Sequence, residues 1–160
     1  MHTDYKVGSL QADTVARAFV VIGQLFPAAS FREWRLATAT DIQRNDWLTA
    51  TDRAGVIRGL CHLFVGEAMP TRQLEVPVFA SISLFDERRI ARVLFEVARE
   101  RAEREHCLRI HFWPAGLAAW PILVRPETQT APRGGLLYDL QGDHDSQTSV
   151  FRTGRRVLPH

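Results

Sequence analysis

One stretch of the sequence, SISLFDERRIARVLFEVARERAEREHCLRIHF (Ser81–Phe112), constrains the fold more than any other. Its pattern predicts the end of a strand, a helix of about five turns that begins near Asp86, and a second strand. Two strands joined by one crossover helix are usually parallel neighbours, so the sequence predicts a βαβ unit around residues 74–113. The helix has one apolar face, made by Ile90, Val93, Leu94, Val97 and Ala98.

The strand that leads into this helix, QLEVPVFASISLF (Gln73–Phe85), carries apolar residues on both faces. Such a strand is typical of the centre of a sheet that is covered on both sides. Pro77 has no N–H to donate to a neighbouring strand, so we expect a bulge or a local break in pairing there. Simple alternation would place one apolar set on the same side, namely Val76, Val78, Ala80, Ile82 and Leu84.

The first half of the chain predicts a strand, two helices and a pair of strands. DYKVGSL (4–10) alternates like a strand, and Asp13 is expected to cap a helix that Pro27 closes. Ser30 is expected to cap a weaker helix over residues 31–40. The next segment reads as two strands joined by a DRAG turn, in which Gly55 supplies a positive φ.

The segment after Trp113 gives weaker signals. GLAAW (116–120) fits a short helix, and GGLLYDL (134–140) fits a strand. We expect one domain over residues 1–160, in which residues 143–160 form a late strand or a tail.

The composition indicates a soluble globular domain. The formal charge is only +2, and the helix from Asp86 to Glu105 carries as many arginines as acids, so we expect no nucleic-acid partner. No apolar run is long enough to cross a bilayer, and no signal peptide is visible, so we expect no membrane contact. Two cysteines, Cys61 and Cys107, are too few for a disulfide-stabilised secreted domain, which favours a cytoplasmic location.

Two Cys–His neighbours, Cys61-His62 and His106-Cys107, raise the question of a metal site. Adjacent residues on a strand point to opposite faces, and the chain contains no Cys-x-x-Cys or His-x-x-x-His spacing. We therefore expect no metal, and we expect the cysteines to be buried thiols.

The order of these elements resembles the GNAT superfamily of acyl-coenzyme A-dependent N-acyltransferases. The residues that carry the resemblance are Gly55–Val65, Leu74–Phe85 and Asp86–Phe112, within roughly residues 47–113. The resemblance implies an α/β (α+β) fold: a single mixed sheet with antiparallel N-terminal strands and the parallel βαβ unit. Homodimers are common in the family, so a homodimer is one expected state.

In that family the fourth strand splays from the fifth, and coenzyme A lies in the opening. Its pantetheine arm follows the fourth strand, which here carries Ile82 and Leu84. Its pyrophosphate binds the turn that opens the next helix, where amide N–H groups and the helix dipole favour anions. The resemblance therefore implies a coenzyme A site made by Ile82, Leu84, Arg88, Arg89, Ala91 and Arg92.

This turn departs from the family pattern Gln/Arg-x-x-Gly-x-Gly/Ala, because the chain reads Asp86-x-x-Arg89-x-Ala91. In one interpretation, Arg88, Arg89 and Arg92 contact the pyrophosphate. In the other, Asp86 is an ordinary N-cap and the arginines are solvated or paired with acids. The sequence leaves both open.

Acyl transfer to an amine requires a base for the ammonium group and an acid for the leaving thiolate. The resemblance implies a carboxylate on the fourth strand as the base, which points to Glu75, with Glu67 as a weaker substitute. It implies a tyrosine as the acid, and Tyr138 is the candidate.

The resemblance implies an N-acyltransferase that uses acetyl-coenzyme A or another acyl-coenzyme A on an unidentified amine, small or protein-borne. The unusual turn favours an alternative, a catalytically inactive GNAT-like binding module. A third hypothesis is a different α/β domain, which strand order and the divergence of the strands near Val78 and Ile110 would distinguish.

Overall fold

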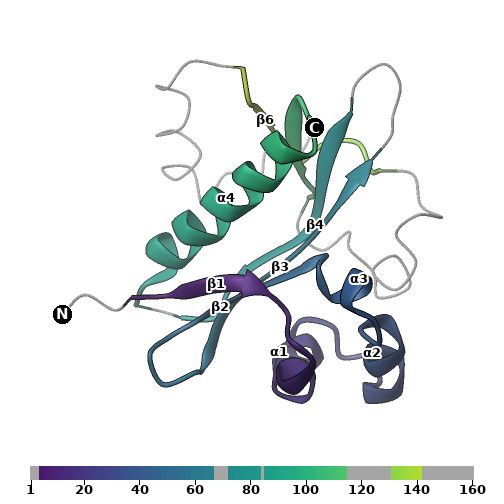
Figure 1. The fold of residues 1–160 in the computed structure, drawn as a ribbon, viewed down its shortest axis with the longest axis vertical. Coiled ribbons are helices and arrows are strands. Elements are labelled where there is room, and N and C mark those ends of the chain that lie inside the picture. Colours follow the sequence, from purple (N-terminus) through teal and green to yellow (C-terminus); the bar gives the residue numbers. More distant parts are fainter. Residues whose placement is uncertain (1–3, 67–71, 84, 115–130, 142–160) are drawn as a thin grey trace.

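The computed structural model describes residues 4–66, 72–83, 85–114 and 131–141 of the chain. These residues form one six-stranded sheet with the order β1-β2-β3-β4-β5-β6 (Figure 1). β4 and β5 pair in parallel and the strands from β1 to β4 pair antiparallel, as predicted, and β6 pairs antiparallel with β5. The elements are β1 (Lys6–Ser9), η1 (Ala12–Thr14), α1 (Val15–Leu25), α2 (Phe31–Ala37), α3 (Asp41–Arg44), β2 (Trp47–Thr51), β3 (Ile57–Gly66), β4 (Gln73–Ser81), α4 (Glu87–Arg104), β5 (Arg109–Phe112) and β6 (Leu136–Asp139).

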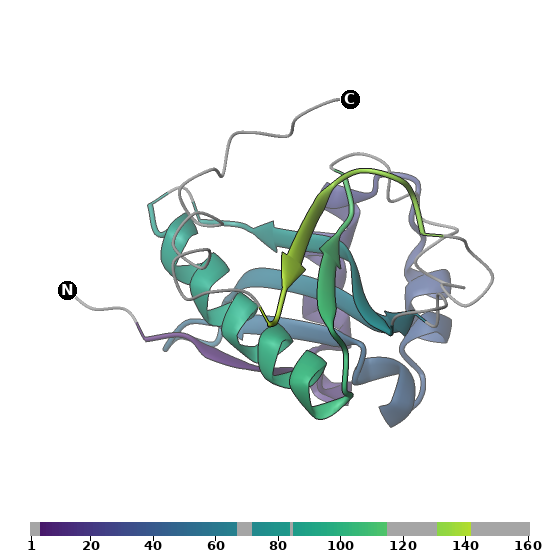
Figure 2. The same cartoon turned by 90° about the horizontal axis from the view of Figure 1, so that it is seen from above.

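Helices cover both faces of the sheet. α4 lies on one face, and α1 and α2 lie on the other (Figures 1 and 2). The core on the α4 side combines the predicted helix stripe with strand residues such as Leu74, Val76 and Ile110. The core on the α1 side packs the helix residues Ile22 and Trp34 against strand residues such as Leu60 and Val78. The chain is therefore a three-layer domain, and burial on both faces accounts for the apolar character of β4.

The predicted irregularity at Pro77 is a β-bulge. His62 of β3 lies opposite Val78, and Phe64 lies opposite Glu75, so β4 uses one residue more than β3 over this interval. The extra residue reverses the alternation. Val76 therefore packs on the α4 side whereas Val78 packs on the α1 side, and the prediction that both share one face was wrong.

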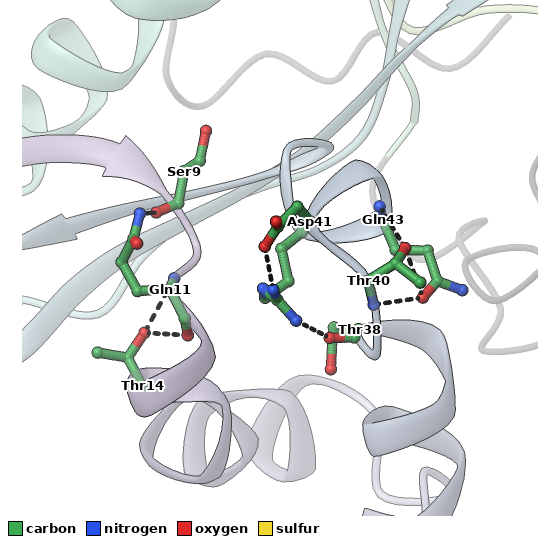
Figure 3. A network of polar contacts seen from close by, with 8 residues as sticks. Ser9, Gln11, Thr14, Thr38, Thr40, Asp41 and Gln43 are labelled. Carbon is green, nitrogen blue, oxygen red and sulfur yellow. Dashed lines mark hydrogen bonds and ion pairs between the residues drawn. The ribbon is translucent and has the colours of Figure 1, made fainter.

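The helix starts are fixed by short polar contacts. The Ser30 hydroxyl accepts from the Glu33 N–H at 3.1 Å, which confirms Ser30 as the cap of α2. Asp13 was wrongly expected to cap α1, because the turn η1 precedes that helix and its N-cap is Thr14. Figure 3 shows the Thr14 contacts with Gln11 beside the capping contacts of α3.

Several smaller expectations are confirmed. Gly55 has a φ of +79° in the turn between β2 and β3. Cys61 and Cys107 are buried free thiols, and burial raises the pKa of both. The strand expected at 134–140 is β6, whereas the helix expected at 116–120 and the tail at 143–160 lie outside the described residues. Among the described helices, none has the length and apolar character that a bilayer crossing needs.

Candidate functional site

β4 and β5 pair over only part of β4. Their register runs from Gln73 opposite Arg109 to Val76 opposite Phe112, and the Trp113 N–H donates to the Val76 carbonyl at 3.0 Å. β4 then continues from Pro77 to Ser81, paired with β3 alone among the described strands. Because Pro77 has no N–H, it cannot extend the ladder. We call the place where β4 continues past Val76, its last residue paired with β5, the β4–β5 fork.

Glu75 lies at the base of this fork inside a buried polar cluster. Only 2% of the residue is exposed. Its Oε2 accepts from Trp113 Nε1 at 2.7 Å and contacts His111 Nδ1 at 2.7 Å. Its Oε1 accepts from Gln73 Nε2 at 2.5 Å. His111 Nε2 contacts the Gly134 carbonyl at 2.7 Å. We call these five residues the Glu75 cluster.

The contacts of the cluster set the charges of its two titratable groups. Burial acts to raise the pKa of Glu75, but the hydrogen bonds from His111, Gln73 and Trp113 favour the carboxylate and bring the pKa below its ordinary value. The hydrogen bond to Glu75 raises the pKa of His111, burial opposes this, and the Gly134 carbonyl adds to the rise. Both shifts favour the carboxylate form of Glu75 and the protonated form of His111.

The two predicted catalytic residues do not meet. Cross-strand partners share a face of a sheet, so Glu75 and His111 lie on the α1 side of β4 and β5. Tyr138 pairs with Ile110 and lies in the core on the α4 side, where its ring stands edge-on to Phe95 at 4.9 Å. The sheet separates Glu75 from Tyr138.

The start of α4 is built from contacts with the N-terminal residues. Asp86 is the N-cap, as one interpretation expected, but its carboxylate accepts from the Tyr5 hydroxyl at 2.6 Å and makes no capping hydrogen bond. Arg89 pairs with Asp4 at 3.4 Å, and Asp4 also pairs with Arg53 at 2.8 Å. An open depression of about 430 Å³ lies beside this group and is lined by Asp4, Tyr5, Lys6, Thr51, Asp52, Arg53 and Gly55.

The other residues predicted to bind coenzyme A lie around this turn. Arg88 and Arg92 are exposed on the first turns of α4, and Ala91 is half-buried. Ile82 packs against the core on the α1 side. Leu84 lies outside the described residues, as does Glu67. The turn is thus near the end of β4, as the family resemblance implied, and the roles of these residues stay predictions.

Aromatic rings cover the α1 side of the sheet between Trp34 and the Glu75 cluster. They follow one another at centroid distances from 4.2 to 6.2 Å. Burial lowers the pKa of His62, within this row, to about 3, so this ring is neutral at physiological pH. Among the described residues, no three His, Cys, Asp or Glu side chains gather as metal ligands would. The row consists of Trp34, Trp47, His62, Phe64 and Trp113.

Sequence reasoning did not connect Glu75 with its neighbours in the structure, which are His111, Trp113, Gln73 and Gly134. The alternation of β5 does place His111 and Trp113 on one face, and parallel pairing brings that strand beside β4. The register is the missing information, because a shift of one residue would turn His111 away from Glu75.

Solved structures share the fold of this chain at low sequence identity. A glucosamine-6-phosphate N-acetyltransferase from Arabidopsis thaliana matches with a TM-score of 0.59 and 11% identity, over 85% of this chain and 99% of that one. An aminoglycoside N-acetyltransferase in complex with coenzyme A matches with a TM-score of 0.56 and 13% identity, over 89% and 98%. The NatC complex bound to a Gag peptide and coenzyme A contains a match with a TM-score of 0.53 and 20% identity, over 79% and 84%.

The chain has a GNAT-like fold. No protein-family model matches the sequence, and a search of curated proteins finds no match. The GNAT-like fold therefore rests on the similar solved structures and on the strand order with its parallel β4–β5 pair, and strand order was one of the two features expected to distinguish the third hypothesis of a different α/β domain.

Proposed function

We propose that the protein is an acyl-coenzyme A-dependent N-acyltransferase. The observation that carries this proposal is the β4–β5 fork, where Pro77–Ser81 has no partner on its β5 side among the described strands and leads toward the start of α4. The main-chain polar groups on this side of Pro77–Ser81, which no described strand pairs with, would hydrogen-bond an extended pantetheine arm. The coenzyme A complexes among the similar structures support the same use of the fold.

The proposal places the coenzyme A phosphates at the start of α4. The first amides of a helix have no intrahelical partner and face outward with the positive end of the dipole. The Asp86 carboxylate does not cap them, because it bonds to Tyr5. Arg88 and Arg92 would add charge-assisted donors from the exposed side of the turn.

Glu75 as the general base belongs to the same proposal. It is the carboxylate at the base of the fork, on the strand where the family resemblance implies a base. Its low pKa makes it a weak proton acceptor while all its donors are in place. Direct catalysis by Glu75 therefore requires a substrate amine to replace one of those donors, and Glu75→Gln should then lower turnover more than coenzyme A affinity.

Calorimetric titration of coenzyme A and acetyl-coenzyme A tests the binding step. Ligand at 100 times its dissociation constant should also stabilise the fold by about 2.7 kcal/mol. Arg92→Glu should weaken binding roughly tenfold or more, since a charge-assisted hydrogen bond contributes about 1.5–3 kcal/mol. Arg104→Glu, at the other end of α4, is the matched control and should leave affinity unchanged. Absence of binding at millimolar ligand would refute the proposal.

A second candidate is a GNAT-like binding module without chemistry. The composition of the α4 start favours it: Asp86 and Glu87 bring negative charge to the turn, and Arg89 is engaged with Asp4. The two candidates differ in one assay, the release of free thiol from acetyl-coenzyme A in the presence of a panel of amines. Tight coenzyme A binding with no amine-dependent thiol release would favour the module.

A further inference from the structure

His111 contacts two groups that accept hydrogen bonds. One of its ring nitrogens faces Glu75 Oε2 and the other faces the Gly134 carbonyl, each at 2.7 Å. A carbonyl only accepts, and so does an ionised carboxylate. A neutral imidazole has one N–H and can satisfy one of the two, whereas the imidazolium has two and can satisfy both.

The surroundings of Glu75 favour its ionised form. Trp113 donates to the oxygen that contacts His111, and Gln73 donates to the other oxygen. Donors on both oxygens stabilise a carboxylate relative to the acid. The geometry is therefore that of a doubly protonated His111 between a carboxylate and a carbonyl.

The Gly134 carbonyl belongs to a segment folded closely against the end of β5. Gly134 and Gly135 have φ values of +84° and +82°. A Cβ on Gly135 would lie 2.1 Å from the Phe112 carbonyl oxygen and 3.0 Å from Pro114 Cδ. Phe112 is also the last residue of β5 that pairs with β4. The contact between His111 Nε2 and the Gly134 carbonyl therefore helps to hold residues 131–135 at the base of the fork.

We propose that His111 is a proton-dependent latch, which holds residues 131–135 and the adjoining strand β6 against β5 while both ring nitrogens carry protons. Loss of one proton leaves the remaining N–H with the Glu75 carboxylate, where the charge attracts it. The bare nitrogen then faces the Gly134 carbonyl oxygen, and two lone pairs oppose each other at hydrogen-bond distance. The contact changes from attractive to repulsive, and the segment is released.

Few other charges act on the latch in the described structure. β4 contributes the Glu75 carboxylate, β3 contributes Phe64 opposite Glu75, and β6 contributes Leu137 opposite His111. Arg109 lies on the same face of β5 but is exposed to solvent. Glu75 is therefore the group that controls the proton on His111.

The sign of the pH dependence follows from the pKa of His111, which is raised above its ordinary value of 6.5. The latch is at full strength below pH 6.5, where the ring stays protonated even when released. Because Glu75 still raises the pKa of the released ring, the latch weakens between that pKa and the higher pKa of the latched ring, by up to about tenfold in equilibrium constant per pH unit. Above the raised pKa the stabilisation is gone.

Nitrogen-15 NMR of the imidazole ring tests the protonation directly in the unmodified protein, with the resonance assigned by its loss in His111→Gln. At pH 6 both His111 nitrogens should show the shifts of protonated imidazolium, and the titration midpoint should lie above 6.5. A neutral ring at pH 6 would overturn the proposal, and this experiment requires no ligand.

Hydrogen exchange tests the release. Protection factors, which correct for the intrinsic pH dependence of exchange, should fall for the β6 amides and Leu140 by up to about tenfold per pH unit as the pH rises through the raised pKa of His111. His111→Gln should abolish this dependence. Glu75→Gln should move its midpoint to lower pH, because the attracting charge is gone.

His106→Asn is the matched control, since His106 is exposed and has a φ of 59° that Asn tolerates. It should retain the wild-type pH dependence. Protection of β6 that does not change between pH 6 and 10, or a midpoint that stays in place in Glu75→Gln, would overturn the latch. These measurements do not involve coenzyme A, so they test the latch independently of the proposed enzyme activity.

Discussion

The two ends of the proposed site are built in different ways. At the base of the fork, Glu75 is 2% exposed and its carboxylate contacts one side chain from β4, one from β5 and that of Trp113, which follows β5. At the start of α4, Asp4 is mostly exposed and its ion pairs with Arg53 and Arg89 lie at the surface. In the first region each buried charge is stabilised by its partner, because water cannot solvate it there. In the second region water or a ligand can replace the partner of a charged side chain.

This difference matters for function. A buried, fully bonded cluster is suited to fixing the position of strands, because losing any one partner leaves another group unsatisfied. A surface group of paired arginines is suited to binding an anion, because exchanging a carboxylate for a phosphate costs little. We therefore expect substitutions in the Glu75 cluster to affect stability and those at the α4 start to affect binding.

The largest effect should come from Glu75→Ala. It leaves the His111 imidazolium and the Trp113 N–H buried without their acceptor. Breaking a buried ion pair costs about 3–5 kcal/mol, so the urea midpoint should fall strongly at pH 7. Glu105→Ala is the control, since its pair with Arg72 is half-exposed at 3.6 Å and should contribute less than about 1 kcal/mol. If Glu75→Ala and Glu105→Ala lowered the free energy of unfolding equally, the proposed difference between the buried and the surface region would be wrong.

A smaller effect is expected from Gly135→Ala, compared with Gly134→Ala. Both positions have φ near +80°, so both substitutions should cost about 1–2 kcal/mol from backbone strain. Gly135→Ala should cost more, because its Cβ would meet the Phe112 carbonyl oxygen at 2.1 Å, whereas at Gly134 the nearest atom is Pro114 Cγ at 3.7 Å. Thermal unfolding of the two variants measures the difference. A Gly135 variant as stable as the Gly134 variant would show that residues 131–135 are not held closely against β5.

The smallest effect is expected from Tyr5→Phe at the α4 start. The variant loses the hydrogen bond to Asp86, which should cost about 0.5–1.5 kcal/mol. The same hydrogen bond raises the pKa of Tyr5 above 10.0, so its contribution should persist below pH 10 and disappear above the raised pKa. A double-mutant cycle with Asp86→Asn measures the coupling. A coupling of zero would mean that Tyr5 does not hold the turn.

The strand–helix–strand unit was predictable because its signals are local. The apolar stripe of α4 and its start next to Asp86 follow from side-chain periodicity and charge, and the crossover rule then gives a parallel pair. The bulge at Pro77 was predictable for the same reason, because a missing N–H is a property of one residue. The side of the sheet to which each β4 residue points was not predictable, since the bulge reverses the alternation in the middle of the strand.

The sequence by itself, through its resemblance to a known family, predicted the fold class and pointed to Glu75 as the carboxylate on the fourth strand. Only the tertiary structure decided what surrounds that carboxylate. His111 lies 36 residues away along the chain and Gly134 lies 59 away, and their meeting depends on strand register and on a two-glycine turn. Register is fixed by the packing of both sheet faces together, so no local pattern of residues contains it.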